Sequence, residues 1–232
     1  MGNRAKSDTL LQAADDLARS RLSGKRYAHT VRVADTAERL ARVHSLDPDR
    51  TRLAALLHDA ARETEPEEFL RVAERWNLPI GEPERESPKL LHASVAAELA
   101  RRELGVEDQE VLEAIRAHTT GCPGMGPIAL ALYVADKIEP ARDYPSVERL
   151  RGLASEDLRM AAAEALRRAI SYNEGRGRSI HPDSRATLEW LEETQGVVQR
   201  GVEQVESVDR EGQGTQSHDE LRRPAGSDPP RQ

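Results

Sequence analysis

The sequence of 232 residues has little cysteine, few aromatic residues and no long apolar run. Its single cysteine, Cys122, excludes an intramolecular disulfide and argues against a cysteine-ligated zinc site or an iron–sulfur cluster. Residues 1–20 lack the apolar stretch of a signal peptide, and no later stretch is long enough to span a membrane. We therefore expect a cytoplasmic protein without a membrane partner.

An excess of basic residues is also missing. Lys and Arg total 34 whereas Asp and Glu total 41, which gives a net charge of −7. Proteins that bind nucleic acid in general carry a basic footprint, so this balance argues against a nucleic-acid partner. It leaves room for a local basic pocket that binds a small anion. The length is typical of one domain with a tail.

The scarcity of aromatic side chains means that the core must consist of Ala, Leu, Val and Ile. Ala and Leu favour helix, and apolar residues recur at helical spacing with no strand-like alternation. We predict an all-α helical bundle. The expected helices cover about residues 8–22, 26–44, 48–62, 66–77, 90–104, 108–119, 127–138, 146–172 with a break near Gly152, and 183–194. Caps are expected at Ser7 or Asp8 and at Asp47 before Pro48.

The composition changes at about Gly196, where Gln, Gly, Ser, Asp and Pro become dominant. Such a segment buries too little apolar surface to offset the entropy lost on ordering it. We therefore predict that residues 1–195 form one helical domain and that residues 196–232 form a disordered tail.

Four histidines and two aspartates fall on the apolar faces of the predicted helices. They are His29, His58, Asp59, His92, His118 and Asp136. A single histidine on such a face is usually a core residue with a hydrogen-bond partner, but an unpaired buried carboxylate is costly. A shared metal centre satisfies all six side chains at once.

The residue types restrict the choice of metal. Imidazole and carboxylate groups without thiolate suit Fe, Mn, Zn or Co. Six ligands exceed the need of one tetrahedral ion, so we expect two divalent ions bridged by Asp59, which follows His58 at a helix position deep in the bundle. Two ions carry +4 against −2 from the aspartates, and this residual charge favours an anionic substrate such as a phosphate ester.

Longer motifs surround these six residues. They are the segments 29–33, 54–63, 117–121 and 133–142, together with His92. This ordered set resembles the HD-domain phosphohydrolases. The run His-Thr-Thr-Gly at 118–121, the run Asp-Lys-Ile-Glu-Pro-x-Arg from Asp136, and Ile-His-Pro at 180–182 resemble more narrowly the YqeK-type symmetrical diadenosine tetraphosphate hydrolases. The resemblance covers about residues 8–191.

The resemblance implies an all-helical bundle with a di-iron centre, although Mn, Co or Zn fits the same ligands. His29, His58, Asp59 and Asp136 would hold one ion, and Asp59, His92 and His118 would hold the other. It also implies that diadenosine tetraphosphate is cut at its centre to give two ADP. In this hypothesis a water bridging the ions, its pKa lowered from about 16 toward 7, attacks a phosphorus in line.

Cations beside the ligands are candidates for contacts with the phosphates. Arg62 and Lys137 are assigned catalytic roles with Asp59, although most Arg and Lys side chains are solvated surface groups. The predicted substrate-binding residues are Arg62, Thr119, Lys137, Arg142, Arg178 and His181. The expected partner is a small dinucleoside polyphosphate, and the chain is expected to be a monomer or homodimer.

Two other functions remain open at this point. The chain is either an HD-domain hydrolase of a different nucleotide or a non-catalytic nucleotide-binding module. Cyclic-dinucleotide phosphodiesterases of this superfamily carry Gly-Tyr-Pro after the region of His118, where this sequence has Gly-Cys-Pro-Gly. Guanosine tetraphosphate hydrolases carry Glu-Asp after their His-Asp pair, where Arg62 and Glu63 stand here. Both differences argue against those two subclasses.

Overall fold

The computed structural model describes residues 2–193, so the predicted tail at 196–232 lies outside the described residues. Within residues 2–193 all regular elements are helices, which confirms the all-α prediction. The labelled elements are α1 (Gly2–Arg21), α2 (Gly24–Val43), α3 (Pro48–Leu57), α4 (Pro66–Arg75), α5 (Glu82–Glu86), the 3₁₀ helix η1 (Pro88–Leu91), α6 (His92–Leu104), α7 (Gln109–Ala117), α8 (Pro127–Ile138), α9 (Val147–Glu156) and α10 (Leu158–Glu174). A further helix covers residues 182–193.

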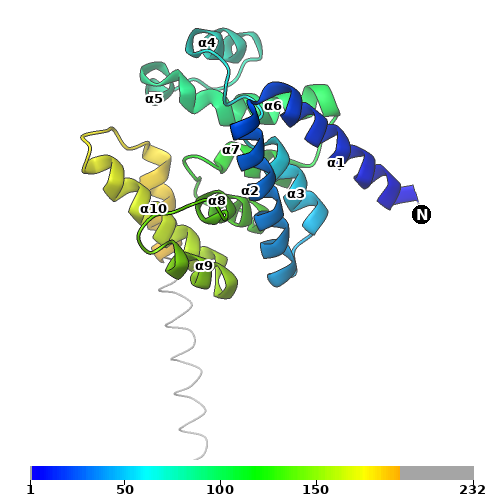
Figure 1. The fold of residues 1–232 in the computed structure, drawn as a ribbon. Coiled ribbons are helices and arrows are strands. Elements are labelled where there is room, and N and C mark those ends of the chain that lie inside the picture. The colour runs from blue at the N-terminus through cyan, green and yellow to red at the C-terminus, as the bar shows by residue number, and fades with distance from the viewer. Residues whose placement is uncertain (1, 194–232) are drawn as a thin grey trace, which may run out of the picture. The chain divides into compact units, whose positions relative to one another are not determined.

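Helix α8 is the central element of the bundle (Figure 1). It packs against α2, α7 and α10, and nearly all of its side chains are buried. Helices α2 and α3 pack side by side, α1 covers α3, and α4 and α5 pack on η1. The core consists mainly of Ala and Leu, as the composition requires, with Phe69 and Tyr133 as its largest fully buried side chains. This arrangement brings α2, α3, α7 and α8 together around one point.

Several helix boundaries agree with the sequence patterns. Asp47 caps α3 with its side chain, as expected, and the structure adds a cap of α7 by Asp108. Helix α8 begins at Pro127 and ends at Ile138, as predicted. Within residues 2–193, no helix has both the length and the apolar character that crossing a membrane requires.

The predicted start of α1 and the predicted end of α3 are wrong. Helix α1 already begins at Gly2, and Ser7 donates to Asp49 instead of capping it. Helix α3 ends at Leu57 rather than near Arg62, and residues 58–63 form consecutive turns. These turns are closed by tighter backbone bonds, such as that from the Arg62 N–H to the Asp59 carbonyl. Asp59 therefore lies in a turn rather than at a helix position.

Two further boundaries differ from the prediction. The proline-rich segment 78–88, predicted as a loop, contains the short helix α5. The long helix predicted at 146–172 is divided at Asp157 and continuous through Gly152. The Asp157 carboxylate accepts from the backbone N–H groups of Arg159 and Met160, so it caps α10 and separates it from α9.

Candidate metal centre

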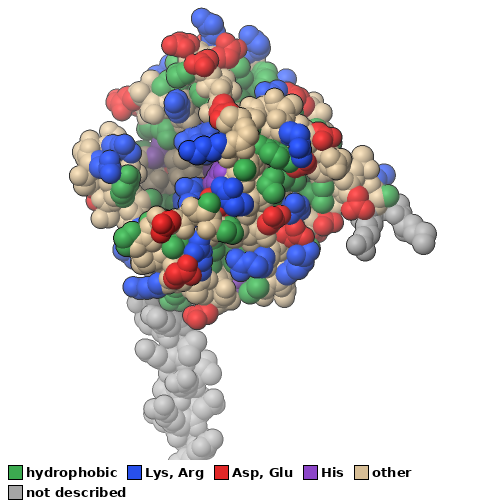
Figure 2. All heavy atoms as spheres, viewed as in Figure 1, with side chains coloured by type: hydrophobic (Ala, Val, Ile, Leu, Met, Phe, Trp, Pro, Cys, Tyr) green, Lys and Arg blue, Asp and Glu red, His purple; other side chains and the backbone are tan. Residues whose placement is uncertain are grey.

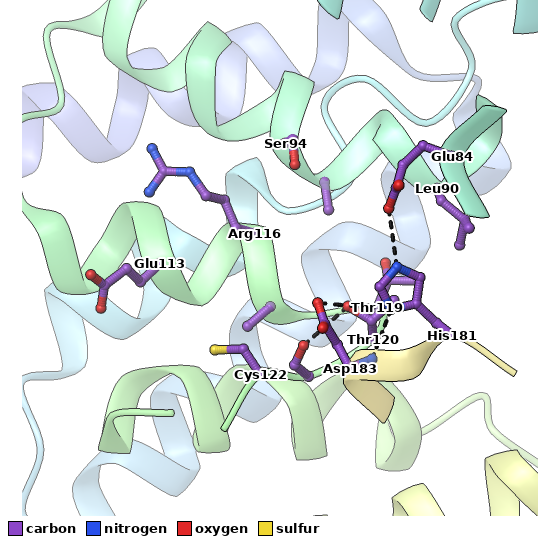
Figure 3. A pocket seen from close by; sticks show the side chains of 13 residues that line it. Glu84, Leu90, Ser94, Glu113, Arg116, Thr119, Thr120, Cys122, His181 and Asp183 are labelled. Carbon is purple, nitrogen blue, oxygen red and sulfur yellow. Dashed lines mark hydrogen bonds and ion pairs between the residues drawn. The ribbon is translucent and has the colours of Figure 1, made fainter. Parts of the chain in front are cut away.

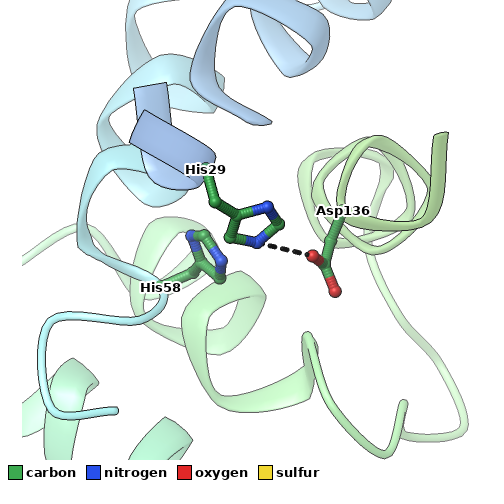
Figure 4. A group of neighbouring side chains, drawn as sticks. All are labelled: His29, His58 and Asp136. Atoms are coloured by element: carbon green, nitrogen blue, oxygen red, sulfur yellow. Dashed lines mark ion pairs between the residues drawn. The ribbon is translucent and has the colours of Figure 1, made fainter. Parts of the chain in front are cut away.

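The structure brings the six predicted ligands together in the middle of the bundle. All six are buried, and they come from α2, the turn after α3, the start of α6, the turn after α7, and α8. They are His29, His58, Asp59, His92, His118 and Asp136. One group of potential ligand atoms joins His29, His58 and Asp136 (Figure 4), and a second joins His58, Asp59 and His118. Within each group the atoms lie within 4.8 Å of one another.

Asp59 faces the histidines with both of its oxygens. Its Oδ1 atom lies 3.4 Å from Nε2 of His92 and 3.6 Å from Nε2 of His118. Its Oδ2 atom lies 3.6 Å from Nε2 of His58. On the other side of His58, Nε2 of His29 lies 3.1 Å from Oδ1 of Asp136. Asp59 thus directs its two oxygens toward different histidines.

Three of the histidines sit where a helix ends, and this position fixes their protonation. His58, His92 and His118 follow the last residues of α3, η1 and α7. In each, Nδ1 lies 2.6–2.7 Å from the carbonyl three residues earlier, which belongs to Ala55, Lys89 or Ile115. A carbonyl only accepts, so Nδ1 carries the proton and Nε2 presents a lone pair.

These lone pairs converge, and the one on His58 has no donor at all. Nε2 of His58 is buried and has no hydrogen-bond partner. Nε2 of His92 lies 3.0 Å from Nε2 of His118. The Thr119 hydroxyl lies near both and can donate to one of them, and a guanidinium nitrogen of Arg62 lies 3.1 Å from Nε2 of His92. A buried group of imidazole lone pairs and carboxylate oxygens matches the ligand set of a divalent cation, so these residues fit a metal centre.

The electrostatics of the site keep four of the six ligands in the protonation states that metal binding requires. Burial lowers the pKa of His58 to about 4 and lowers the pKa of His92 well below its ordinary value. Burial alone would raise the pKa of Asp59, but the facing histidines outweigh it and the pKa falls. For Asp136, Lys137 and His29 likewise outweigh burial and lower the pKa. His58 and His92 are therefore neutral imidazoles, and Asp59 and Asp136 are ionised carboxylates.

Three predicted cationic residues lie against the ligands. Lys137 Nζ lies 2.7 Å from Oδ2 of Asp136, and a guanidinium nitrogen of Arg142 lies 2.8 Å from Oδ1. Burial lowers the pKa of Lys137, but Asp136 raises it by more, so the ammonium stays charged. A guanidinium nitrogen of Arg62 lies 3.1 Å from both ring nitrogens of His92.

Sequence reasoning missed a fourth cation and a carboxylate. Arg26 lies 3.1 Å from Oδ2 of Asp59. It precedes His29 by three residues, so helical spacing could have identified it. The Glu139 carboxylate accepts from Nδ1 of His29 at 3.2 Å and from Nε of Arg32 at 2.6 Å. Its signal was its place in the run from Asp136 to Arg142, directly after α8.

A basic cavity of about 420 Å³ opens beside His29. Lys25, Arg26, Arg32 and Arg142 line it. Figure 2 shows histidine side chains between Lys and Arg side chains in a hollow of the surface. A chain with a net charge of −7 thus places cations next to its candidate metal ligands.

A second cavity of about 270 Å³ lies next to Thr119 (Figure 3). His181 forms one wall, and its Nε2 atom lies 3.0 Å from Glu84 Oε1. Carboxylates outnumber cations in its lining, whereas Lys and Arg outnumber the two glutamates that line the basic cavity. Of the predicted substrate contacts, Arg178 is exposed in the loop before His181 and lines neither cavity.

Comparison with known proteins gives a consistent result. The HD domain family matches residues 26–141. The chain is similar to proteins named symmetrical bis(5'-nucleosyl)-tetraphosphatase. It is 37% identical to that of Bacillus subtilis over 173 residues, which is 75% of this chain and 92% of the relative. It is also 37% identical to that of Halalkalibacterium halodurans over 175 residues, which is 75% of this chain and 93% of the relative.

A solved structure supports the same relationship. The crystal structure of a protein described as a predicted HD superfamily hydrolase involved in NAD metabolism, from Clostridium acetobutylicum, superposes with a TM-score of 0.76. The two chains are 32% identical, and the match covers 79% of this chain and 97% of the other.

Proposed function

Because this chain belongs to the HD-domain family and to its branch of symmetrical bis(5'-nucleosyl)-tetraphosphatases, we propose that it hydrolyses diadenosine tetraphosphate to two ADP. The observation that carries the proposal is the convergence of four histidines and two aspartates beside a basic cavity. Its substrate is a small dinucleoside polyphosphate, whose four phosphates match the charge of that cavity.

The donor set supports two divalent ions. His29, His58, Asp59 and Asp136 would hold one, and Asp59, His92 and His118 would hold the other. Iron is our first choice, and Mn, Co and Zn suit the same ligands. When bound, such ions lower the pKa of water and neutralise charge on phosphoryl oxygens.

The side chains around the ligands position the substrate. Arg26, Arg62, Lys137 and Arg142 each lie within 3.1 Å of a candidate ligand, so phosphates held by them lie next to the centre. Guanidinium groups bind phosphate oxygens in pairs and fix their orientation. The charge of these residues also offsets the charge that develops on the phosphoryl oxygens during attack.

The second cavity offers a place for a nucleoside. Its mixed lining of Thr119, Thr120 and Leu90 with carboxylates suits a base and sugar better than a phosphate. Thr119 lies between this cavity and Nε2 of His92 and His118, so a nucleoside there would lead its phosphates toward the centre. In this assignment His181 contacts the substrate from the wall of the cavity, and Arg178 approaches from the neighbouring loop.

Product analysis tests the proposal. Metal-replete protein is incubated with dinucleoside tri-, tetra- and pentaphosphates, and the products are separated by chromatography. We expect ADP alone from diadenosine tetraphosphate. Formation of ATP and AMP would show asymmetric cleavage and overturn the proposal, and absence of turnover with bound nucleotide would identify a binding module instead.

A further inference from the structure

The four histidines of the centre are not held in the same way. His58, His92 and His118 each lie at a helix end and bond a backbone carbonyl of their own chain segment. His29 lies within α2, where the nearby carbonyls already accept the N–H groups of the helix. Its Nδ1 atom therefore needs a partner from elsewhere, and Oε1 of Glu139 lies 3.2 Å from it.

Glu139 is fixed by donors on its other oxygen. Its side chain is 3% exposed. Oε2 accepts from Nε of Arg32 at 2.6 Å and from the backbone N–H of Ala141 at 2.8 Å. The backbone of the same turn is held by Arg151, which donates to the carbonyls of Ile138 and Glu139. The carboxylate thus faces His29 from a rigid support.

We propose that Glu139 is a positioning residue that keeps the proton of His29 on Nδ1 and so directs the Nε2 lone pair toward the metal. The role rests on the metal centre proposed above. A carboxylate partner also makes an imidazole a stronger ligand than a carbonyl partner does, because its negative charge raises the basicity of the ring. Glu139 therefore gives His29 the support that the other three histidines receive from the backbone.

The amide variant Glu139→Gln tests this role because the geometry dictates how the amide must lie. Arg32 and Ala141 both donate toward the position of Oε2, so the amide oxygen must occupy that place. The amide NH₂ group then faces Nδ1 of His29 and donates to it. The ring proton moves to Nε2, and the atom that should bind metal no longer has a free lone pair.

The experiment measures metal affinity and the position of the proton. Zn²⁺ binding is titrated against a competing chelator, and ¹H–¹⁵N spectra of ¹⁵N-histidine protein report which ring nitrogen is protonated. We expect Glu139→Gln to weaken binding of one ion by about 10–100-fold, the range for loss of such partners. We also expect Nδ1 of His29 to carry a proton in the unsubstituted protein and to lose it in Glu139→Gln, whichever state Nε2 adopts beside Oδ1 of Asp136. Asp136→Asn removes charge from a proposed ligand of the ion beside His29. The step of the Zn²⁺ titration that this variant weakens therefore belongs to that ion.

Matched variants separate positioning from a structural role. Glu98→Gln changes another buried glutamate, one that is paired with Arg101 and Arg102 on α6, and should leave Zn²⁺ binding unchanged. Arg32→Leu removes the ion pair but leaves Oε1 facing His29, so the proton should stay on Nδ1. If the amide variant fails to fold, Glu139→Asp keeps an acceptor and should retain the Nδ1 proton with a smaller loss of affinity.

Two results would overturn the inference. Unchanged Zn²⁺ affinity in Glu139→Gln, with the His29 proton still on Nδ1, would overturn the role of Glu139 and leave the metal centre standing. Failure of the unsubstituted protein to bind metal would overturn the centre itself and this role with it.

Discussion

The two sides of the candidate centre are built on different principles. On the turn side, His92 and His118 end helical segments, Asp59 lies in a turn, and backbone carbonyls orient the imidazoles. On the helix side, His29 and Asp136 lie within α2 and α8, and charged side chains orient them. The turn side therefore depends on backbone conformation. The helix side depends on side chains that a substitution can change without moving the backbone.

Asp59 joins the two sides. Its loss should therefore lower activity and metal content more than any other substitution. Asp59→Ala would remove an oxygen from both proposed ions and leave Arg26 without its partner. We expect kcat/KM to fall more than about 1,000-fold, which corresponds to about 4 kcal/mol. Metal content should fall further than in His29→Ala or His92→Ala. Elemental analysis of protein purified with iron under anaerobic conditions measures this, with about two ions per chain expected before substitution.

Full metal occupancy in Asp59→Ala would contradict the bridging role. Asp59→Asn provides a second test, since it keeps the size of the side chain while removing its charge. An equal loss of metal in Asp59→Ala and in the single histidine variants would show that each ligand serves one ion only.

Arg62 separates substrate positioning from metal binding on the turn side. It lies 3.1 Å from His92 but is not a ligand, so Arg62→Gln should leave metal content unchanged. Loss of one charged hydrogen bond costs about 1.5–3 kcal/mol, and we expect kcat/KM to fall about 10–100-fold. Steady-state kinetics with metal analysis of the same sample checks both points. Arg71→Gln, an exposed arginine on α4, is the control and should behave like the unsubstituted protein.

The sequence predicts the helix side better than the turn side. Helical spacing places His29 and Asp136 on the inward faces of α2 and α8, and both helices have nearly the predicted bounds. The same spacing extends α3 through Asp59 and Arg62, where the chain actually turns. Hydrophobic periodicity does not distinguish the last turn of a helix from a tighter turn with the same apolar residues, because both bury them on one side.

The supporting contacts were harder to predict than the ligands. The six candidate ligands stand out because a polar side chain on an apolar face requires an explanation. Glu139 lies beside Pro140 just after α8, where a charged residue at a helix end is unremarkable. Its role depends on Arg32 and His29, more than 100 positions earlier in the chain. The tail at residues 196–232 lies outside the described residues and stays a prediction from composition.

Gly121 tests how far the turn side depends on backbone conformation. Its φ of +73° is in the left-handed region, and an added Cβ would lie 2.9 Å from Cγ2 of the buried Thr187. Gly121→Ala should lower the free energy of unfolding by about 1–3 kcal/mol. Gly105→Ala is the matched control, because φ is +66° there but no atom lies within 4 Å of the added Cβ. Chemical denaturation should show a larger loss for Gly121→Ala, and equal losses would exclude a contribution from Thr187.

The smallest effect on stability is expected from substitution of Glu63. This residue links the start of α2 to the turn after α3 by hydrogen bonds. Its carboxylate accepts from the backbone N–H of Ser23 at 2.6 Å and from the Ser23 hydroxyl at 2.7 Å. These bonds lower the pKa of Glu63 below its ordinary value of 4.5. Because the pKa of Glu63 is lower in the folded protein, its bonds to Ser23 stabilise the fold fully above about pH 4.5. This stabilisation is lost as the pH falls through the pKa of Glu63 in the folded protein.

Glu63→Gln should therefore reduce stability at neutral pH by less than about 1 kcal/mol, because the group is exposed and solvent screens it. The difference from the unsubstituted protein should be constant above about pH 5 and should shrink on acidification. Urea denaturation with chelator present, measured at several pH values, removes metal loss from the comparison. A difference that stays unchanged on acidification below pH 4.5 would mean that protonated Glu63 still binds Ser23. The two sides of the centre would then be joined by a hydrogen bond that does not need the charge.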